Sequence, residues 1–290
     1  MAVAELDRWE GTDVGVGQLE RRLGDLRGAA AEDGLIRTSV LTHVAWVPPE
    51  WEAQALDTLA GMAERHPSRT IVIVPEPEAE DGIDAAVALR AFPLPESDRS
   101  ICTEVIELRL RGRRSAAAAS IDAPLVVADL PVFLRWRGLP PFGEAALEDL
   151  VDFADRLIVD STEWSGLPAP YGQLAAIFPR IAVSDIAWAR TSRWRRQLAS
   201  LWPGIRDVQK IRVRGTEAQA HLLAGWLRSR LEKAVGLEHE PADRLLGLDI
   251  DGEQAPFPPG DPPQPSDVLS DELDRFTRDP VYEAAVAATI

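Results

Sequence analysis

Residues 35–74, LIRTSVLTHVAWVPPEWEAQALDTLAGMAERHPSRTIVIV, indicate the fold class because two apolar runs flank a helical pattern. The first run, at residues 40–46, ends shortly before a pair of prolines. The second, TIVIV at residues 70–74, is continuous and β-branched, as in strands that are buried on both faces. Between them, apolar residues recur at the spacing of a helix that packs on a sheet. A strand, a helix and a second strand form the crossover unit of a parallel sheet, so we expect an α/β fold.

Strands and helices continue to alternate along the rest of the chain. Further strands are expected at residues 101–111, 125–136 with a bend at 129–131, 156–160 and 208–214. Helices are expected at residues 147–154, at 174–178, from 192 onward and from 216 onward, where Thr216 and Gln219 form a capping-box pattern. We therefore predict mixed, largely parallel sheet layers flanked by helices, in two α/β subdomains.

Changes in sequence character suggest five segments. Residues 238–266 are expected to be a proline-rich linker, because six prolines in a short stretch favour an extended chain and exclude helix interior. The other segments are an N-terminal helical segment (1–34), an N-terminal α/β domain (35–165), a second α/β domain (166–237) and a C-terminal helical tail (267–290).

Composition excludes several classes of function. The net charge of -16 argues against a nucleic-acid or membrane-surface partner, because phosphates are bound by clustered Lys and Arg. The first residues lack the pattern of a signal peptide, and no apolar run is long enough to span a bilayer, so a cytoplasmic protein is expected. One cysteine and four scattered histidines give no ligand spacing for a metal, and we expect no cofactor.

One candidate site combines five polar residues beside the predicted strands. They are His66, Arg69, Glu104, Asp129 and Asp160. Gathered in a pocket at the strand ends, they would suit a small-molecule-binding enzyme or sensor. Alternatively, Arg69 could form a structural bridge with Glu104, and the two aspartates could cap loops or helix starts. No glycine-rich phosphate motif or G-x-S-x-G elbow is present, so we expect no catalysis.

A second candidate site is the segment DIAWARTSRW at residues 185–194. It combines Trp188, Arg190, Arg193 and Trp194, and Trp and Arg are enriched among residues that dominate binding energy at protein interfaces. We interpret these four residues as a partner-binding surface. The alternative is that the tryptophans pack in the core while the arginines solvate a helix face.

Six blocks of sequence, taken in order, resemble the OpcA family of glucose-6-phosphate dehydrogenase assembly proteins. The blocks are RTSVLTHVAWV (37–47), RHPSRTIVIV (65–74), ICTEVIEL (101–108), DLPVFLRWRG (129–138), DRLIVDS (155–161) and SDIAWARTSRWR (184–195). This resemblance covers roughly residues 35 to 230. It implies a non-catalytic, allosteric partner that binds glucose-6-phosphate dehydrogenase, in the pentose phosphate pathway, and either favours its active oligomer or raises its affinity for substrate. The richness in Arg and Ala suggests an actinobacterial type.

Overall fold

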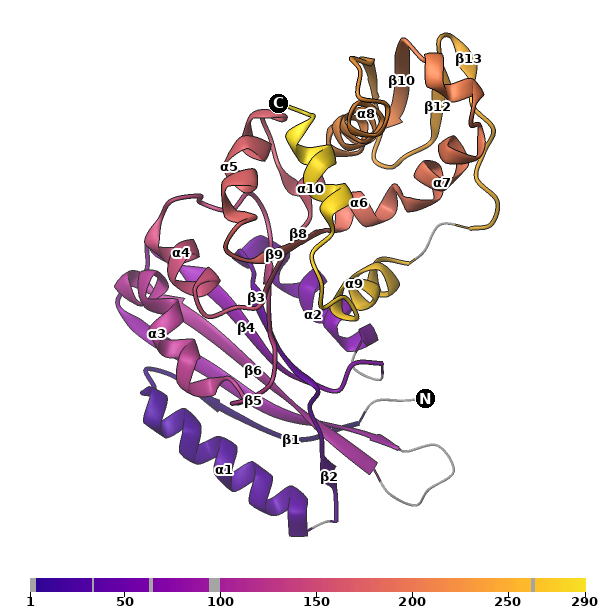
Figure 1. Ribbon diagram of the computed structural model, residues 1–290. Coiled ribbons are helices and arrows are strands. Elements are labelled where there is room, and N and C mark those ends of the chain that lie inside the picture. The colour runs from indigo at the N-terminus through magenta and orange to yellow at the C-terminus, as the bar shows by residue number, and fades with distance from the viewer. Residues whose placement is uncertain (1–3, 33, 63–64, 94–99, 262–263) are drawn as a thin grey trace. The chain divides into compact units, whose positions relative to one another are not determined.

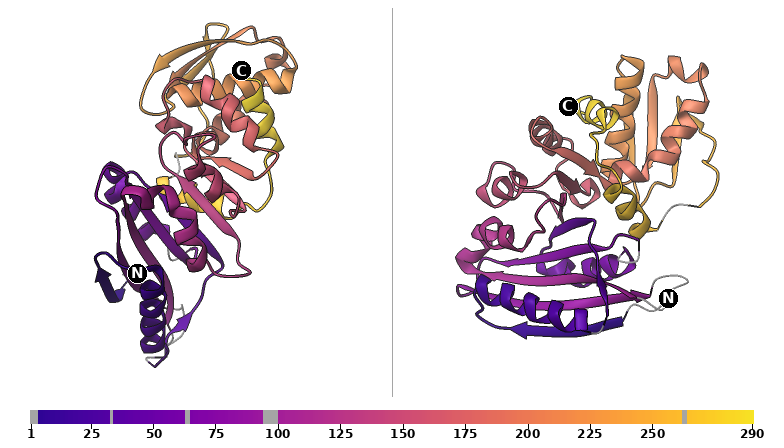
Figure 2. Two further views of the ribbon diagram at one scale, coloured as in Figure 1. Left: turned by 90° about the vertical axis from the view of Figure 1, so that its left-hand side faces the viewer. Right: turned by 60° about the horizontal axis from the view of Figure 1, so that its bottom comes forward.

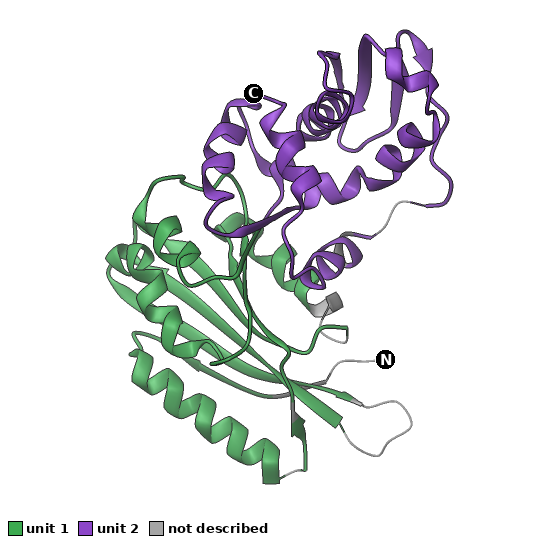
Figure 3. Ribbon diagram, viewed as in Figure 1, with its two compact units in different colours: residues 1–157 green, residues 158–290 purple. Residues whose placement is uncertain are grey.

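The computed structural model describes residues 4–32, 34–62, 65–93, 100–261 and 264–290. The chain divides into two compact units, Met1–Leu157 and Ile158–Ile290 (Figure 3). The boundary falls inside strand β8 (Arg156–Val159).

Unit 1 is built on a mixed sheet (Figure 1). Its strands are ordered β1 (Ala4–Gly11), β5 (Gly82–Pro93), β6 (Ser100–Arg111), β4 (Ser68–Glu76), β3 (Leu41–Trp46) and β7 (Val132–Trp136), while β2 (Ile36–Arg37) pairs with β6. The pairs β6 with β4, β4 with β3 and β3 with β7 are parallel, whereas β1 with β5 and β5 with β6 are antiparallel. The predicted mixed, largely parallel α/β fold is therefore confirmed.

The helices of unit 1 cover this sheet. They are α1 (Val16–Glu32), α2 (Glu52–Met62), α3 (Ala118–Asp122) and α4 (Ala145–Val151), with 3-10 turns η1 (Pro49–Trp51), η2 (Gly112–Ala117) and η3 (Ala123–Leu125). Leu19, Leu23 and Leu26 form a buried stripe on α1, which packs against β5 (Figure 2). The first strand-helix-strand unit, β3, α2 and β4, lies where the opening stretch of sequence predicts it.

Unit 2 contains a second sheet with the strand order β11-β10-β12-β13. These strands are β11 (Gly236–Pro241), β10 (Lys210–Gly215), β12 (Gly247–Ile250) and β13 (Glu253–Gln254). Strand β9 (Ala182–Asp185) is not part of this second sheet and lies next to β8 in the strand order. The helices are α5 (Ala169–Ile177), α6 (Ile186–Arg190), α7 (Ser192–Ser200), α8 (Glu217–Leu231), α9 (Pro265–Leu273) and α10 (Pro280–Ala287), with 3-10 turns η4 (Ser161–Glu163) and η5 (Gly204–Asp207). The predicted capping box, Thr216 with Gln219, begins α8 and is confirmed.

Helix α10 packs closely on α8 and also contacts α5 (Figure 1). The approach to α8 is made at Gly225, where a Cβ atom would overlap the carbonyl oxygen of Ala285 and lie 2.8 Å from Cγ2 of Thr289. Only glycine leaves room for the neighbouring backbone at this position. The glycine thus sets the distance between the two helices.

Two of the predicted segments, 1–34 and 238–266, differ from the prediction. The described residues of the predicted helical segment 1–34 start with a strand, β1, which pairs with β5 at an edge of the sheet. The predicted linker 238–266 contains most of β11, all of β12 and β13, and the first residues of α9. Most residues of β11 are exposed or half-buried, so this strand lacks the apolar run that marks a buried one.

The predicted strand at 125–136 is also shorter in the structure. It begins only at Val132, because residues 126–130 form a turn in which Asp129 has a φ of 66°. A left-handed backbone of this kind interrupts a strand and is tolerated best by Gly, Asn and Asp. The prediction located the irregularity at the correct residue but extended the strand across it.

Asp122, the last residue of α3, is fully buried, and within the described residues neither of its carboxylate oxygens has a hydrogen-bond partner. Burial disfavours the charged carboxylate and raises its pKa from 3.8 to about 7. The folded protein therefore holds this proton more tightly than the unfolded chain does. The stability that this proton contributes is present below about pH 4 and is lost as the pH rises to about 7.

Asp122→Asn is expected to remove this pH dependence. We compare the free energy of unfolding of the variant with that of the wild type at each pH. This difference should favour the variant by at least ~1 kcal/mol more at pH 8 than at pH 4, since one pKa unit corresponds to ~1.4 kcal/mol. Urea unfolding at both pH values measures the difference. Asp149→Asn, on the exposed side of α4, is the control and should change little at either pH. An equal effect of Asp122→Asn at the two pH values would contradict the assignment.

Candidate functional site

Arg69 and Glu104, two of the predicted ligand-binding residues, form a buried ion pair between β4 and β6. Nε of Arg69 donates to Oε2 of Glu104 at 2.6 Å, and its Nη1 donates to the carbonyl oxygen of Leu125 at 2.6 Å. Nε of Arg27 donates to Oε1 of the same glutamate at 2.6 Å. Burial raises the pKa of Glu104, but the hydrogen bonds and charges of Arg27 and Arg69 outweigh it and hold the pKa below its usual value. The interpretation of this pair as a structural bridge is confirmed.

The other three ligand candidates lie in different surroundings. His66 is buried beside a space of only about 10 Å³, which it lines together with Ser68 and Thr70. A space of this size holds about one water molecule. Asp129 is exposed on its turn in unit 1. Asp160 belongs to unit 2, where it caps the 3-10 turn η4 by accepting a hydrogen bond from the backbone of Thr162.

The two tryptophans of the predicted partner-binding segment contribute to the packing of unit 2. Trp188 is 3% exposed, packs on the ring of Tyr282 at 5.6 Å and donates from its indole nitrogen to Asp279 at 2.9 Å. Trp194 is 6% exposed, and its ring lies 5.6 Å from that of Phe257. Their side chains are therefore mostly covered by the chain itself.

Asp185 positions this segment by capping α6 from inside the unit. Its carboxylate accepts hydrogen bonds from the backbone of Ala187 at 2.8 Å, from Oγ of Ser161 at 2.6 Å and from the hydroxyl of Tyr282 at 3.2 Å. Burial raises the pKa of Asp185 to about 6, and the charge of Asp160 adds to this shift. The network ties α6 to both η4 and α10, so the start of the segment is rigidly held.

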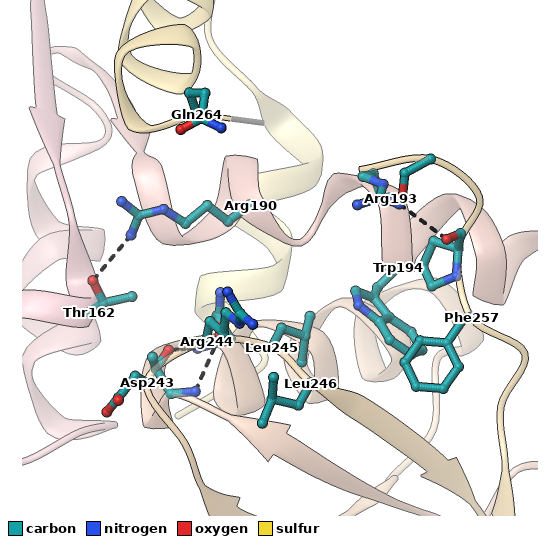
Figure 4. A pocket seen from close by; sticks show the side chains of 14 residues that line it. Thr162, Arg190, Arg193, Trp194, Asp243, Arg244, Leu245, Leu246, Phe257 and Gln264 are labelled. Carbon is teal, nitrogen blue, oxygen red and sulfur yellow. Dashed lines mark hydrogen bonds between the residues drawn. The ribbon is translucent and has the colours of Figure 1, made fainter. Parts of the chain in front are cut away.

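The two arginines of the segment lie in the wall of a hollow of about 800 Å³ (Figure 4). Nη1 of Arg190 donates to Oδ2 of Asp160 at 2.8 Å and reaches Oγ1 of Thr162 at 3.4 Å. Nη2 of Arg193 donates to the carbonyl oxygens of residues 258–260, at 3.1 Å for Pro258 and 2.7 Å for Pro259. Both guanidinium groups are thus oriented by the chain itself.

The prediction missed Arg244, Leu245, Leu246 and Phe257, which also line this hollow, because they lie in the segment that was expected to be a linker. Arg244 and Leu246 are exposed, and Phe257 is 60% exposed. Phe257 stands alone among prolines, and an aromatic residue in such a stretch could have indicated that the segment contacts a surface. Arg244 gave no comparable signal.

The described ranges contain neither a metal-binding cluster nor a membrane-spanning helix. No group of three or more His, Cys, Asp or Glu side chains there could hold a metal ion. In the same residues, no helix has both the length and the apolar character that crossing a bilayer requires.

Comparisons with known proteins match both units. Residues 60–177 match a family model described as the glucose-6-phosphate dehydrogenase subunit N-terminal domain, and residues 181–257 match the corresponding C-terminal domain. An OxPP cycle protein named OpcA from Synechocystis sp. is 25% identical over 207 residues, which are 67% of this chain and 43% of that protein. Its namesake from Nostoc punctiforme is 26% identical over 195 residues, or 63% and 42% of the two chains. The chain spans less than half the length of these curated relatives.

Proposed function

This chain belongs to the OpcA family of glucose-6-phosphate dehydrogenase subunits, and on that premise we propose that it binds glucose-6-phosphate dehydrogenase as a non-catalytic, cytoplasmic assembly protein. The observation that supports this most strongly is the match of two consecutive family models to residues 60–177 and 181–257. The proposed role is to favour the active oligomer of the dehydrogenase in the oxidative pentose phosphate pathway.

An assembly protein of this kind works through a difference in affinity. It shifts the dehydrogenase towards one oligomeric or conformational state only if it binds that state more tightly than the others. If the assembly protein raises the affinity of the dehydrogenase for its substrate by some factor, the substrate must raise the affinity of the dehydrogenase for the assembly protein by the same factor. The proposed activity therefore needs an interaction surface and no catalytic group.

The proposed interaction surface is centred on helices α6 and α7. Arg190 and Arg193 remain in the proposed contact set, whereas Trp188 and Trp194 support it from inside the unit. Trp202 follows α7 directly and is 61% exposed, and it adds an accessible aromatic side chain to this surface. Trp and Arg are the residue types that dominate binding energy at protein interfaces.

The alternative, a small-molecule enzyme or sensor built on His66, Arg69, Glu104, Asp129 and Asp160, has weaker support. Arg69 and Glu104 use their polar atoms on each other and on neighbouring groups of unit 1. Asp160 is engaged by Arg190 and Thr162 within unit 2. The carboxylates of Glu104 and Asp160 are thus paired with arginines of the chain, so they present little free charge to a substrate.

The test is a titration of this chain into purified glucose-6-phosphate dehydrogenase from the same organism. Sedimentation velocity would follow the oligomer, and steady-state kinetics would follow its affinity for glucose 6-phosphate. We expect the dehydrogenase to sediment faster and to respond to lower substrate concentrations. If neither property changed at about micromolar concentrations, where a useful complex has a binding free energy near -8 kcal/mol, the proposal would be wrong.

Arg190→Ala and Trp202→Ala are each expected to weaken binding to the dehydrogenase by roughly 30-fold, which corresponds to the ~2 kcal/mol typical of a hot-spot residue. The thermal midpoint of Trp202→Ala should remain near that of the wild type because its side chain is largely exposed. Titration calorimetry on the folded variants measures the affinity. Phe276→Ala, a similarly exposed aromatic residue, is the control, and equal losses at Trp202 and Phe276 would argue against a localised surface.

A further inference from the structure

The hollow in unit 2 is the strongest candidate for a ligand site in the described part of the chain. Its volume of about 800 Å³ falls in the range of small-molecule pockets. Its wall combines apolar side chains, among them Trp194 and Leu245, with hydroxyl and amide groups from Thr162 and Gln264. Such a mixture suits a small polar molecule more than a lipid or a metal ion.

Charge distinguishes this hollow from the rest of an acidic chain. Among the described residues that line it, three are arginines, Arg190, Arg193 and Arg244, and one, Asp243, carries a carboxylate. Asp160 stands behind Arg190 and offsets one of the positive charges. Within the residues that the structure describes, neither Arg193 nor Arg244 has a carboxylate in ion-pair range. With Asp160 and Asp243 both counted, the wall keeps one net positive charge, and the guanidinium groups of Arg193 and Arg244 favour an anionic ligand.

The arginines also retain hydrogen-bond donors. A guanidinium group carries five N–H donors, and the described bonds engage only Nη1 of Arg190 and Nη2 of Arg193. Figure 4 shows Arg190 and Arg244 entering the space from different segments of the chain. Because Arg190 and Arg193 are already held by neighbouring groups, a ligand would not have to immobilise them itself.

From these observations we infer that the hollow binds a phosphomonoester of a small polar molecule. The phosphate would accept hydrogen bonds from Arg244, whose planar, forked donors match phosphate oxygens, while Arg190 and Arg193 add positive charge to the wall. The polar part of the ligand would lie against Thr162 and Gln264.

The test uses the purified full chain without the dehydrogenase, so its outcome is separate from that of the assembly proposal. Inorganic phosphate, glucose 6-phosphate and uncharged glucose are titrated at constant ionic strength by calorimetry. We expect saturable binding of both phosphates, with glucose 6-phosphate tighter, and none of glucose. The absence of saturation up to about 10 mM, well above a Kd of ~1 mM, or equal binding of glucose and glucose 6-phosphate, would overturn the inference.

Arg244→Ala is the diagnostic variant because its side chain is exposed and has no described partner, so folding should be unaffected. It is expected to weaken the binding of glucose 6-phosphate by about 10-fold, through loss of a charge-assisted hydrogen bond. Arg206→Ala removes another exposed arginine of unit 2 that does not line the hollow, and it should bind as the wild type does. Equal weakening in both variants would indicate a general charge effect and overturn the assignment of the site.

Discussion

Glu104→Ala is expected to destabilise unit 1 by about 3 to 5 kcal/mol, because it removes the buried carboxylate that pairs with the buried guanidinium of Arg69. Glu104 is 1% exposed and accepts hydrogen bonds from both Arg69 and Arg27. The bond from Arg69 to the carbonyl oxygen of Leu125 supplies a dipole but no negative charge. Urea unfolding monitored by circular dichroism measures the loss.

A matched control lies three residues further along the same strand. Glu107 pairs with Arg8, and the nearest atoms of the two side chains are 3.2 Å apart near the surface. Because solvent screens such a pair, Glu107→Ala should cost no more than about 1 kcal/mol. Comparable losses in the two variants would mean that burial of the Arg69–Glu104 pair does not determine its contribution.

Gly225→Ala is expected to destabilise unit 2 by up to about 3 kcal/mol, the usual cost of overpacking a well-filled interior. The added methyl group would overlap the carbonyl oxygen of Ala285, so α10 would have to move away from α8. Thermal unfolding would report the loss. Hydrogen exchange of the α10 amides should increase, because this helix would lose contacts with α8.

The same substitution in α1 should have the opposite sign. A Cβ atom added at Gly24 meets no other atom within 4 Å, so Gly24→Ala adds no clash. It should stabilise the protein by roughly 0.5 to 1 kcal/mol, because alanine reduces the conformational freedom of the unfolded chain. If both variants lowered the thermal midpoint, close approach of α10 would not be the reason for the glycine at position 225.

The parts of the fold that could be predicted from sequence are those whose residues form a local pattern. The TIVIV run became β4, the alternation from residue 101 became β6, and Thr216 with Gln219 begins α8 as expected. Strands β1 and β5 escaped prediction because they depend on each other across long sequence separation. β5 is also rich in alanine, which has little preference for strands.

The candidate site was predictable only in part, for a similar reason. Arg190, Arg193 and Trp194 are close in sequence, and their residue types indicated a binding surface. Arg244 and Phe257 reach the same hollow from segments about fifty or more residues further along, and no local pattern connects them with α7. Burial of Trp188 and Trp194 could not be inferred either, because apolar patterning is the same for a core residue and an interface residue.

The bonds from Arg193 to the carbonyl oxygens of residues 258–260 have a thermodynamic consequence for any ligand in the hollow. One guanidinium group serves both the attachment of this backbone segment and the wall of the site. A ligand that draws on Arg193 therefore either reinforces or competes with that attachment, so the two equilibria are linked. Linkage is reciprocal. If the ligand changes the equilibrium constant for attachment of this segment by some factor, attachment of the segment must change the affinity for the ligand by the same factor.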